Sequence, residues 1–208
     1  MAADSPPRAL LVDYGGVLTT DIWSSFSAFC RERGLDPEAA KKLFRESPDA
    51  MAELRRLERG EVEPAVFEKR FAELLGTEPD GLVEGLFAGL GPDEAMIEAV
   101  RRAGRAGIPT GLVSNSWVMG HYSDELRELF DAVVISGEVG MHKPEPEIFN
   151  LAAERVGRPP EDCVFVDDLR ENCAGAERVG MTAVLHRGSA ATVARLEELL
   201  GAGLRASG

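Results

Sequence analysis

The sequence predicts an α/β protein with a Rossmann-like parallel sheet, helices on both faces of that sheet, and a small all-helical cap inserted after the first strand. Short apolar segments alternate with amphipathic helical patterns from about residue 92 onward, and wholly apolar strands are typical of a parallel sheet that is covered on both faces. Between residues 20 and 88 only helical patterns occur. We therefore expect a core domain at residues 1–19 and 89–208 and a cap domain at residues 20–88.

Five apolar runs are the expected strands, and helical patterns fill the segments between them. The runs lie at residues 9–13, 111–113, 132–135, 163–166 and 182–185, and the core helices are expected around residues 96–103, 126–130, 148–156, 171–179 and 192–200. Apolar residues at helical spacing predict cap helices at residues 22–30, 51–57 and 66–75. Asp36-Pro37-Glu38 predicts a further helix start, with Asp36 as the N-cap.

The composition is that of a globular and strongly acidic chain. The 208 residues are 44% hydrophobic and 28% charged, and the formal net charge is -13, which argues against nucleic acid or an anionic membrane surface as a partner. An anionic substrate would need local positive charge from a metal ion, a lysine or a helix N-terminus. The length suffices for one α/β core with a smaller appended domain.

The cysteines and the N-terminal segment favour a cytoplasmic protein. Cys30, Cys163 and Cys173 show no repeated spacing, which favours reduced thiols over disulfides or a zinc site. Residues 1–8 contain no apolar signal core, and no segment approaches the ~20 apolar residues of a membrane span. We expect a cytoplasmic location and no membrane partner, and the sequence leaves the oligomeric state open.

Polar residues follow the expected strands at the edge where ligands of open α/β sheets bind. In chain order these residues are Asp13 after the first strand, Ser114 and Asn115 after the second, Lys143 after the third, and Asp167 and Asp168 after the fourth. Each has a simpler explanation when it is taken alone, as a turn residue or a solvated lysine. The two adjacent acids are the hardest to explain in that way, because they repel one another unless a cation lies beside them.

This set of residues is coherent for phosphoryl transfer. Asp13 would attack phosphorus and form an aspartyl-phosphate, and Asp13, Asp167 and Asp168 would hold Mg²⁺. Ser114 and the following backbone N–H would bind phosphate oxygens, and Lys143 would neutralise the nucleophile and the transferring group. The expected substrate-binding residues are Gly16, Ser114 and Asn115, and the expected catalytic residues are Asp13 and Lys143.

Four motifs resemble those of the haloacid dehalogenase-like (HAD) hydrolase superfamily. They are Asp13-Tyr14-Gly15-Gly16, Val113-Ser114-Asn115-Ser116-Trp117, Gly140-Met141-His142-Lys143-Pro144 and Val164-Phe165-Val166-Asp167-Asp168. The last three look like the N-terminal phosphatase domain of soluble epoxide hydrolases, and residues 57–61 resemble part of its small helical cap, which closes over the site and supplies specificity. The resemblance implies that Asp13, the backbone carbonyl of Gly15 and Asp168 ligate Mg²⁺, with Asp167 nearby or acting through water, and that Asn172 lies beside the site.

Gly15 departs from the family pattern. The resemblance implies an aspartate at this position, which protonates the leaving group and later activates water, and such acid–base catalysis is typically worth ~10²–10⁴ in rate. Three interpretations stay open. The protein is a phosphatase for a good leaving group, such as an anomeric sugar phosphate or an acyl phosphate; it is a phosphonatase- or dehalogenase-like hydrolase; or it is a catalytically weak regulatory binding protein.

Two observations argue against the dehalogenase-like and phosphonatase-like interpretations. Haloacid dehalogenases work without metal, and the Asp167-Asp168 pair argues against that chemistry because uncompensated carboxylates would raise the pKa of the nucleophile. A phosphonatase would need a cap lysine as a Schiff base, for which Lys41, Lys42 and Lys69 qualify by location only. The expected function is therefore a Mg²⁺-dependent phosphatase that acts on a small phosphorylated metabolite. Trp117 and His142 have no assigned role.

Overall fold

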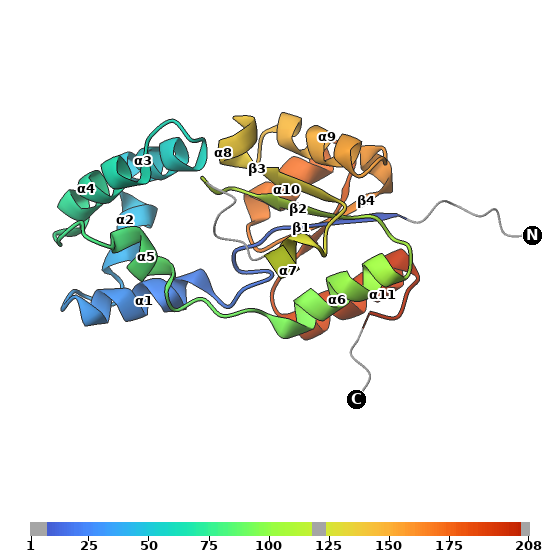
Figure 1. The fold of residues 1–208 in the computed structure, drawn as a ribbon, viewed down its shortest axis with the longest axis horizontal. Helices are drawn as coiled ribbons and strands as arrows, with labels where there is room; N and C mark the ends of the chain where they lie inside the picture. Colours follow the sequence, from blue (N-terminus) through green and yellow to red (C-terminus); the bar gives the residue numbers. More distant parts are fainter. Residues whose placement is uncertain (1–7, 118–123, 205–208) are drawn as a thin grey trace, which may run out of the picture.

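Five parallel strands form the centre of the chain in a computed structural model, which describes residues 8–117 and 124–204 (Figure 1). The strands are β1 (Ala9–Val12), β2 (Thr110–Ser114), β3 (Ala132–Ile135), β4 (Cys163–Asp167) and β5 (Thr182–Leu185). Their order across the sheet is β3-β2-β1-β4-β5, so the chain extends the sheet to one side of β1 and then returns to the other side. Such a reversal of strand order opens a crevice at the carboxyl ends of the strands. The predicted parallel sheet is confirmed.

Helices cover both faces of the sheet, as the sequence predicts. α6 (Glu94–Arg105) and α11 (Ser189–Leu200) lie on one face, and α9 (Pro146–Arg155) and α10 (Arg170–Arg178) lie on the other. Successive side chains of a strand point to opposite faces, so Leu10 of β1 packs with the first pair of helices and Leu11 packs with the second. The short helices α7 (Asp124–Arg127) and α8 (Ser136–Val139) and the 3-10 helix η2 (Pro160–Asp162) lie in connections between strands.

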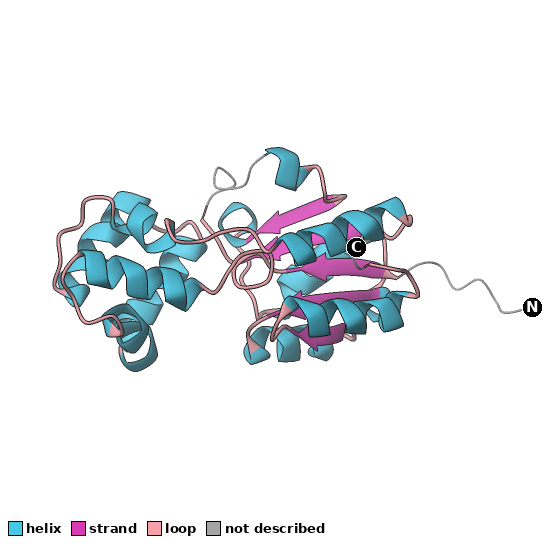
Figure 2. Ribbon diagram, turned by 90° about the horizontal axis from the view of Figure 1, so that it is seen from below, coloured by secondary structure: helices cyan, strands magenta, loops and turns pink. Residues whose placement is uncertain are grey.

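A lobe of helices stands beside the sheet and belongs to the segment between β1 and β2 (Figures 1 and 2). Its helices are α1 (Ile22–Glu32), α2 (Ala39–Glu46), α3 (Pro48–Glu58), α4 (Pro64–Leu75) and α5 (Leu82–Phe87). They enclose a hydrophobic cluster of their own, in which the ring of Phe71 stacks on those of Phe44 and Phe67 at centroid distances of 4.8 and 5.1 Å. The helical insertion after the first strand is thus observed, while the boundaries between core and cap domains stay a prediction.

The helices α5 and α8 match none of the expected helices, and two expected helices have other bounds than predicted. α2 begins at Ala39 rather than directly after Asp36, because Asp36 closes a turn: its Oδ1 accepts from the N–H of Glu38 at 2.9 Å, and its carbonyl accepts from the N–H of Ala39 at 2.8 Å. The helix expected around residues 126–130 is shorter, since α7 ends at Arg127. In both places the sequence pattern predicts the helix correctly. The residue at which the helix begins or ends depends on turn geometry that the pattern does not contain.

Cys30, Cys163 and Cys173 are buried free thiols. Within residues 8–117 and 124–204, no helix is both long enough and apolar enough to cross a bilayer. The expectation of no signal segment concerns residues 1–8, of which residues 1–7 lie outside the described part of the chain.

Phe71→Ala should destabilise the protein strongly. Its side chain is fully buried between two aromatic rings, and truncating a buried phenylalanine costs about 3–5 kcal/mol because a cavity is left. We expect the free energy of unfolding in urea to fall by that amount. Val66→Ala is the matched control on the same helix: Val66 is 46% exposed, although its helical spacing predicted burial, and its truncation should cost at most about 0.5 kcal/mol. Equal losses would show that Phe71 is not a core residue.

Candidate active site

The pairing of β1 with β4 brings two of the predicted acids side by side. Val12 pairs with Val166, so Asp13 and Asp167 reach the carboxyl ends of neighbouring strands together. The ladder continues for one more hydrogen bond, from the N–H of Asp13 to the carbonyl of Val166 at 2.9 Å. Both acidic side chains are buried, and a buried charge needs a partner that replaces water.

Lys143 is that partner. Its Nζ lies 2.7 Å from Oδ1 of Asp13 and 2.7 Å from Oδ2 of Asp167, and its side chain is only 1% exposed. The ammonium also lies 5.4 Å from the ring centroid of Phe165, a position in which the ring face attracts positive charge. Burial alone would lower the pKa of Lys143, but the two carboxylates outweigh this effect and hold the pKa above its usual value. The lysine is therefore a fixed positive charge at the ends of β1 and β4.

Asp167 is held from several directions. Its Oδ1 accepts hydrogen bonds from the N–H of Leu169 at 2.8 Å and from Nδ2 of Asn172 at 3.0 Å, and its Oδ2 lies 3.0 Å from the same nitrogen. Asn172, which the resemblance put beside the site, thus orients a carboxylate from the first turn of α10. Because Lys143 binds Oδ2 as well, both oxygens of Asp167 already have partners.

Asp168 completes a group of three carboxylates. Asp13, Asp167 and Asp168 each offer an oxygen, and these oxygens lie within 4.8 Å of one another. Burial raises the pKa of Asp13 to about 7, with Lys143 opposing the shift and the two other acids adding to it. Burial and then repulsion from Asp167 raise the pKa of Asp168 to about 6. One lysine does not balance three carboxylates, and such a group suits a divalent cation that prefers oxygen ligands.

The turn after Asp13 depends on Gly16. Its φ is +73°, which favours a glycine, and a Cβ there would lie 2.9 Å from Oδ2 of Asp168, so a side chain at this position would also have to displace that carboxylate. The N–H of Gly16 donates to Oγ1 of Thr19 at 3.0 Å, which closes the turn. The carbonyl of Gly15, an expected metal ligand, belongs to the same turn.

Ser114 and Asn115 stand at the end of the neighbouring strand. Ser114 is the buried last residue of β2. Asn115 is bonded to the backbone of Lys143, because its Oδ1 accepts from the N–H at 2.9 Å and its Nδ2 donates to the carbonyl at 3.1 Å. Asn115 therefore positions the lysine, and the binding of substrate by Ser114, Asn115 and Gly16 stays a prediction.

A family model described as haloacid dehalogenase-like hydrolase matches residues 7–180. The chain belongs to this family. Bifunctional epoxide hydrolase 2 of Rattus norvegicus is 31% identical over 114 residues, which are 51% of this chain and 21% of the rat protein. A glyceraldehyde 3-phosphate phosphatase of Methanopyrus kandleri is 36% identical over 103 residues, which are 47% of this chain and 44% of that phosphatase. The matched region thus spans less than half of the length of either relative.

Solved structures of haloacid dehalogenase-like enzymes share the fold of this chain. An enzyme of the family from Bacteroides thetaiotaomicron has a TM-score of 0.68 at 24% identity, covering 88% of this chain and 95% of the other. The same enzyme in complex with magnesium and inorganic phosphate has a TM-score of 0.65 at 23% identity, with the same coverage. At this level of identity the similarity establishes the α/β architecture and leaves the substrate open.

The lobe of this haloacid dehalogenase-like hydrolase contacts the loop that carries Lys143. The sequence analysis did not predict this contact. Nε2 of His142 lies 2.7 Å from Oε2 of Glu58 at the end of α3, and Nδ1 of His142 lies 3.3 Å from Nδ2 of Asn115. Arg59 forms an ion pair with Glu145 in the same loop. The pairs His142–Glu58 and Arg59–Glu145 join residues that are 84 and 86 positions apart in the chain, so no local sequence pattern predicts them.

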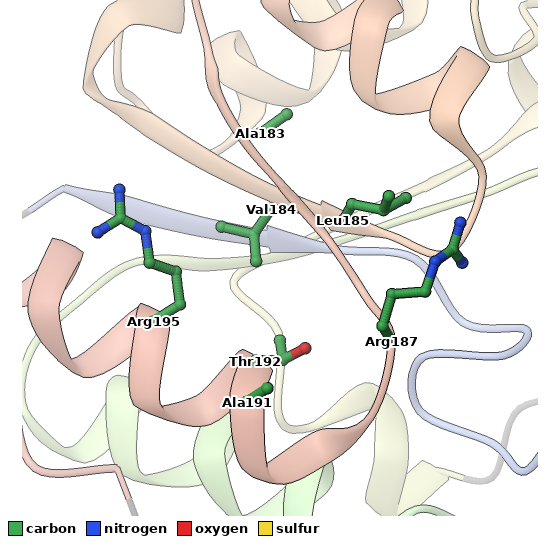
Figure 3. Close-up of a pocket in the computed structure, with 7 residues that line it drawn as sticks. All are labelled: Ala183, Val184, Leu185, Arg187, Ala191, Thr192 and Arg195. Atoms are coloured by element: carbon green, nitrogen blue, oxygen red, sulfur yellow. The ribbon is translucent and has the colours of Figure 1, made fainter.

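A groove elsewhere on the surface contains none of the predicted site residues. It lies between β5 and α11 (Figure 3), and its lining residues are Ala183, Val184, Leu185, Arg187, Ala191, Thr192 and Arg195. The two arginines point to opposite ends of the groove. Arg187 donates to the backbone carbonyl of Asp168 at 2.9 Å, so it helps to hold the backbone that carries one of the three carboxylates.

Gly16→Ala should cost more stability than Gly34→Ala. The two glycines have φ of +73° and +71°, but a Cβ at Gly34 would meet nothing within 4 Å, whereas one at Gly16 would meet the carboxylate of Asp168. Left-handed backbone costs an alanine about 1–2 kcal/mol, which both variants should lose. The clash should add at least about 1 kcal/mol at Gly16. Urea unfolding measures both losses, and equal values would mean that Asp168 moves aside freely.

Proposed function

We propose that this haloacid dehalogenase-like hydrolase is a Mg²⁺-dependent phosphatase that forms an aspartyl-phosphate on Asp13 and acts on a small phosphorylated metabolite in the cytoplasm. The observation that carries the proposal is the buried contact of Lys143 with Asp13 and Asp167, with Asp168 beside them. The relatives support it: one is called a glyceraldehyde 3-phosphate phosphatase, and one enzyme of the same fold was solved with magnesium and inorganic phosphate.

Asp13 is the nucleophile in this proposal. Its Oδ1 contacts Lys143, and its other oxygen attacks phosphorus, so that a bond to Asp13 forms while the P–O bond of the ester breaks. The ammonium of Lys143 favours the ionised form of Asp13 and compensates the charge of the phosphoryl group. Ser114, at the end of the neighbouring strand, binds a phosphate oxygen, and Asn115 keeps Lys143 in place.

The acidic residues fit a magnesium ion. Asp13 and Asp168 would be its carboxylate ligands, with the carbonyl of Gly15 and with Asp167 directly or through water. Asp168 is the more available member of the acidic pair, because both oxygens of Asp167 already accept hydrogen bonds. When bound, the ion would supply positive charge that polarises the phosphoryl group and favours the ionised acids.

Gly15 limits the leaving group in the proposed reaction. No carboxylate can act from this position, so the departing oxygen must leave with little help from an acid. Anomeric phosphates and acyl phosphates, whose leaving groups are less basic, tolerate this better than phosphate esters of simple alcohols. We further propose that residues 20–88 act as a cap that faces the leaving group.

The alternative chemistries have weaker support. A phosphonatase would need a desolvated lysine on the lobe, whereas Lys42 and Lys69 are exposed and Lys41 pairs with Glu38 at 3.5 Å. Metal-free dehalogenation is opposed by the raised pKa of Asp13, about 7, because a carboxyl group with that pKa is only about half ionised as a nucleophile at neutral pH unless a cation is bound. A binding protein without turnover is the remaining alternative.

Asp13→Asn should abolish turnover. We expect hydrolysis of 4-nitrophenyl phosphate by the purified protein with Mg²⁺ to fall at least about 10³-fold, since the amide cannot form the aspartyl-phosphate. Glu171→Gln is the control, an exposed acid on α10 whose change should leave the rate within about twofold. Hydrolysis that survives in Asp13→Asn overturns the mechanism. A wild-type protein that binds Mg²⁺ but hydrolyses no sugar, nucleotide, acyl or aryl phosphate supports the binding protein instead.

The affinity for Mg²⁺ should rise with pH. Asp13 and Asp168 have pKa values raised to about 7 and about 6, so protons compete with the ion below these values and are released when it binds. Calorimetric titration with Mg²⁺ should show a dissociation constant at least about tenfold lower near pH 8 than near pH 5.5. Asp168→Asn should weaken binding at both pH values and flatten the difference. A pH-independent affinity would contradict these carboxylates as ligands.

A further inference from the structure

The positions of Gly15 and Gly16 restrict a side chain for different reasons. Gly16 has a left-handed backbone, with φ at +73°, whereas φ of Gly15 lies outside that region and does not itself require a glycine. A Cβ at Gly15 would nevertheless lie 2.8 Å from Cδ1 and 3.7 Å from Cγ1 of Ile22. The space that a side chain at this position would enter is therefore filled by an apolar residue of the lobe.

Ile22 is held in that place by the start of α1. It is the first residue of the helix, and the N-cap Asp21 fixes the first turn, because its Oδ2 accepts from the N–H and the Oγ of Ser24 at 2.8 and 2.7 Å. The atom nearest to a Cβ at Gly15 is the terminal methyl of Ile22, so a side chain at Gly15 would have to displace this methyl by rotation about χ2. The side chain of Ile22 also packs, half-buried, against the hydrophobic cluster of the lobe.

Two aromatic side chains pack on the same hydrophobic cluster of the lobe as Ile22. Phe87 and Trp117 are half-buried like Ile22 and pack on the same cluster, with their ring centroids 5.7 Å apart. Trp117 follows Ser114 by three positions, and β2 is the strand next to β1. The charged groups that act on Asp13, in contrast, come from the sheet side and are Lys143, Asp167 and Asp168.

We propose that Ile22 is a specificity-determining residue: it fills the space beside Gly15 that a proton donor would need, and it presents an apolar surface to the leaving group. This inference rests on the proposed phosphatase function and names its substrate class. The substrates are phosphate monoesters of acidic hydroxyls on an apolar, unsaturated carbon, which are aryl and enol phosphates. The bond from Asp13 to phosphorus forms as the ester P–O bond breaks, the electron pair leaves with the organic oxygen, and water supplies its proton.

A double-mutant cycle tests Ile22 with two substrates of similar size. The variants are Gly15→Asp, Ile22→Ala and their combination, and the substrates are 4-nitrophenyl phosphate, with a good leaving group, and 2-phenylethyl phosphate, with a poor one. Relative to Ile22→Ala, the double variant should hydrolyse 2-phenylethyl phosphate about 10²-fold faster, with little change for the nitrophenyl ester. Gly15→Asp alone should gain less than about a tenth of that increase, because Ile22 keeps the carboxyl from the departing oxygen. Equal gains in both backgrounds overturn the proposal.

Asp21 provides a second arm of the test. It is the acid nearest to Ile22 in the chain, and Asp21→Asn preserves the cap because asparagine is an equally good N-cap. The proposal expects the ratio of the two rates to stay unchanged in this variant. A loss of rate with 2-phenylethyl phosphate alone would show that Asp21 donates the proton. That result would overturn the proposal that no acid of the protein stands beside the leaving group.

A stability cycle separates failure of this inference from failure of the proposed function. Gly15→Ala should lower the urea midpoint in the wild-type background and lower it less in the Ile22→Ala background, whether or not the protein hydrolyses phosphates. If wild-type protein shows no hydrolysis that depends on Asp13, the phosphatase function and the substrate class fall together, while coupling in urea still shows that Ile22 fills the space. Turnover that depends on Asp13, combined with no coupling in either cycle, overturns the role of Ile22 alone.

Discussion

The buried ammonium of Lys143 between two carboxylates is the interaction on which the rest of the site depends. A lysine that is 1% exposed stays charged only where partners replace water, and the same condition applies to Asp13 and Asp167. Removing one member of such a cluster typically costs about 3–5 kcal/mol, because it leaves a buried charge alone. The three side chains therefore require one another. Asp168 adds a further carboxylate beside them, and the excess of negative charge favours a cation at the open side of the group.

The parallel sheet supplies the positions that this cluster needs. The pairing of Val12 with Val166 places Asp13 and Asp167 at equal height, and a slip of one residue would turn one of them to the opposite face. The lysine comes from a loop, so its position is less constrained by the sheet. Asn115 compensates by bonding both the N–H and the carbonyl of Lys143. Strand register thus fixes Asp13 and Asp167, and the side chain of Asn115 fixes the backbone of Lys143.

Much of the fold and of the candidate site could be predicted because the strands are short apolar runs and polar residues follow them directly. Asp13 and Asp167 stand at strand ends, where a local pattern is sufficient. The partner of Asn115 could not be predicted. Its amide bonds to the backbone of Lys143 because of the course of the loop that carries the lysine, and the sequence pattern does not describe that course. The contacts of Glu58 and Ile22 also escaped prediction. They depend on how the lobe packs against the sheet, which is a long-range property of the folded chain.

The lobe touches the site region from two directions, and the two contacts differ in kind. The start of α1 puts Ile22 against Gly15, while the end of α3 puts Glu58 against His142, the residue before Lys143. The first contact is apolar and concerns the space around the leaving group; the second is polar and concerns the loop of the fixed positive charge. A movement of the lobe would change both at once, because α1 and α3 belong to one hydrophobic cluster. Under the proposed function, the lobe therefore selects substrates by the shape and polarity of the space it leaves beside Asp13, and Ile22 contributes no acid to that space.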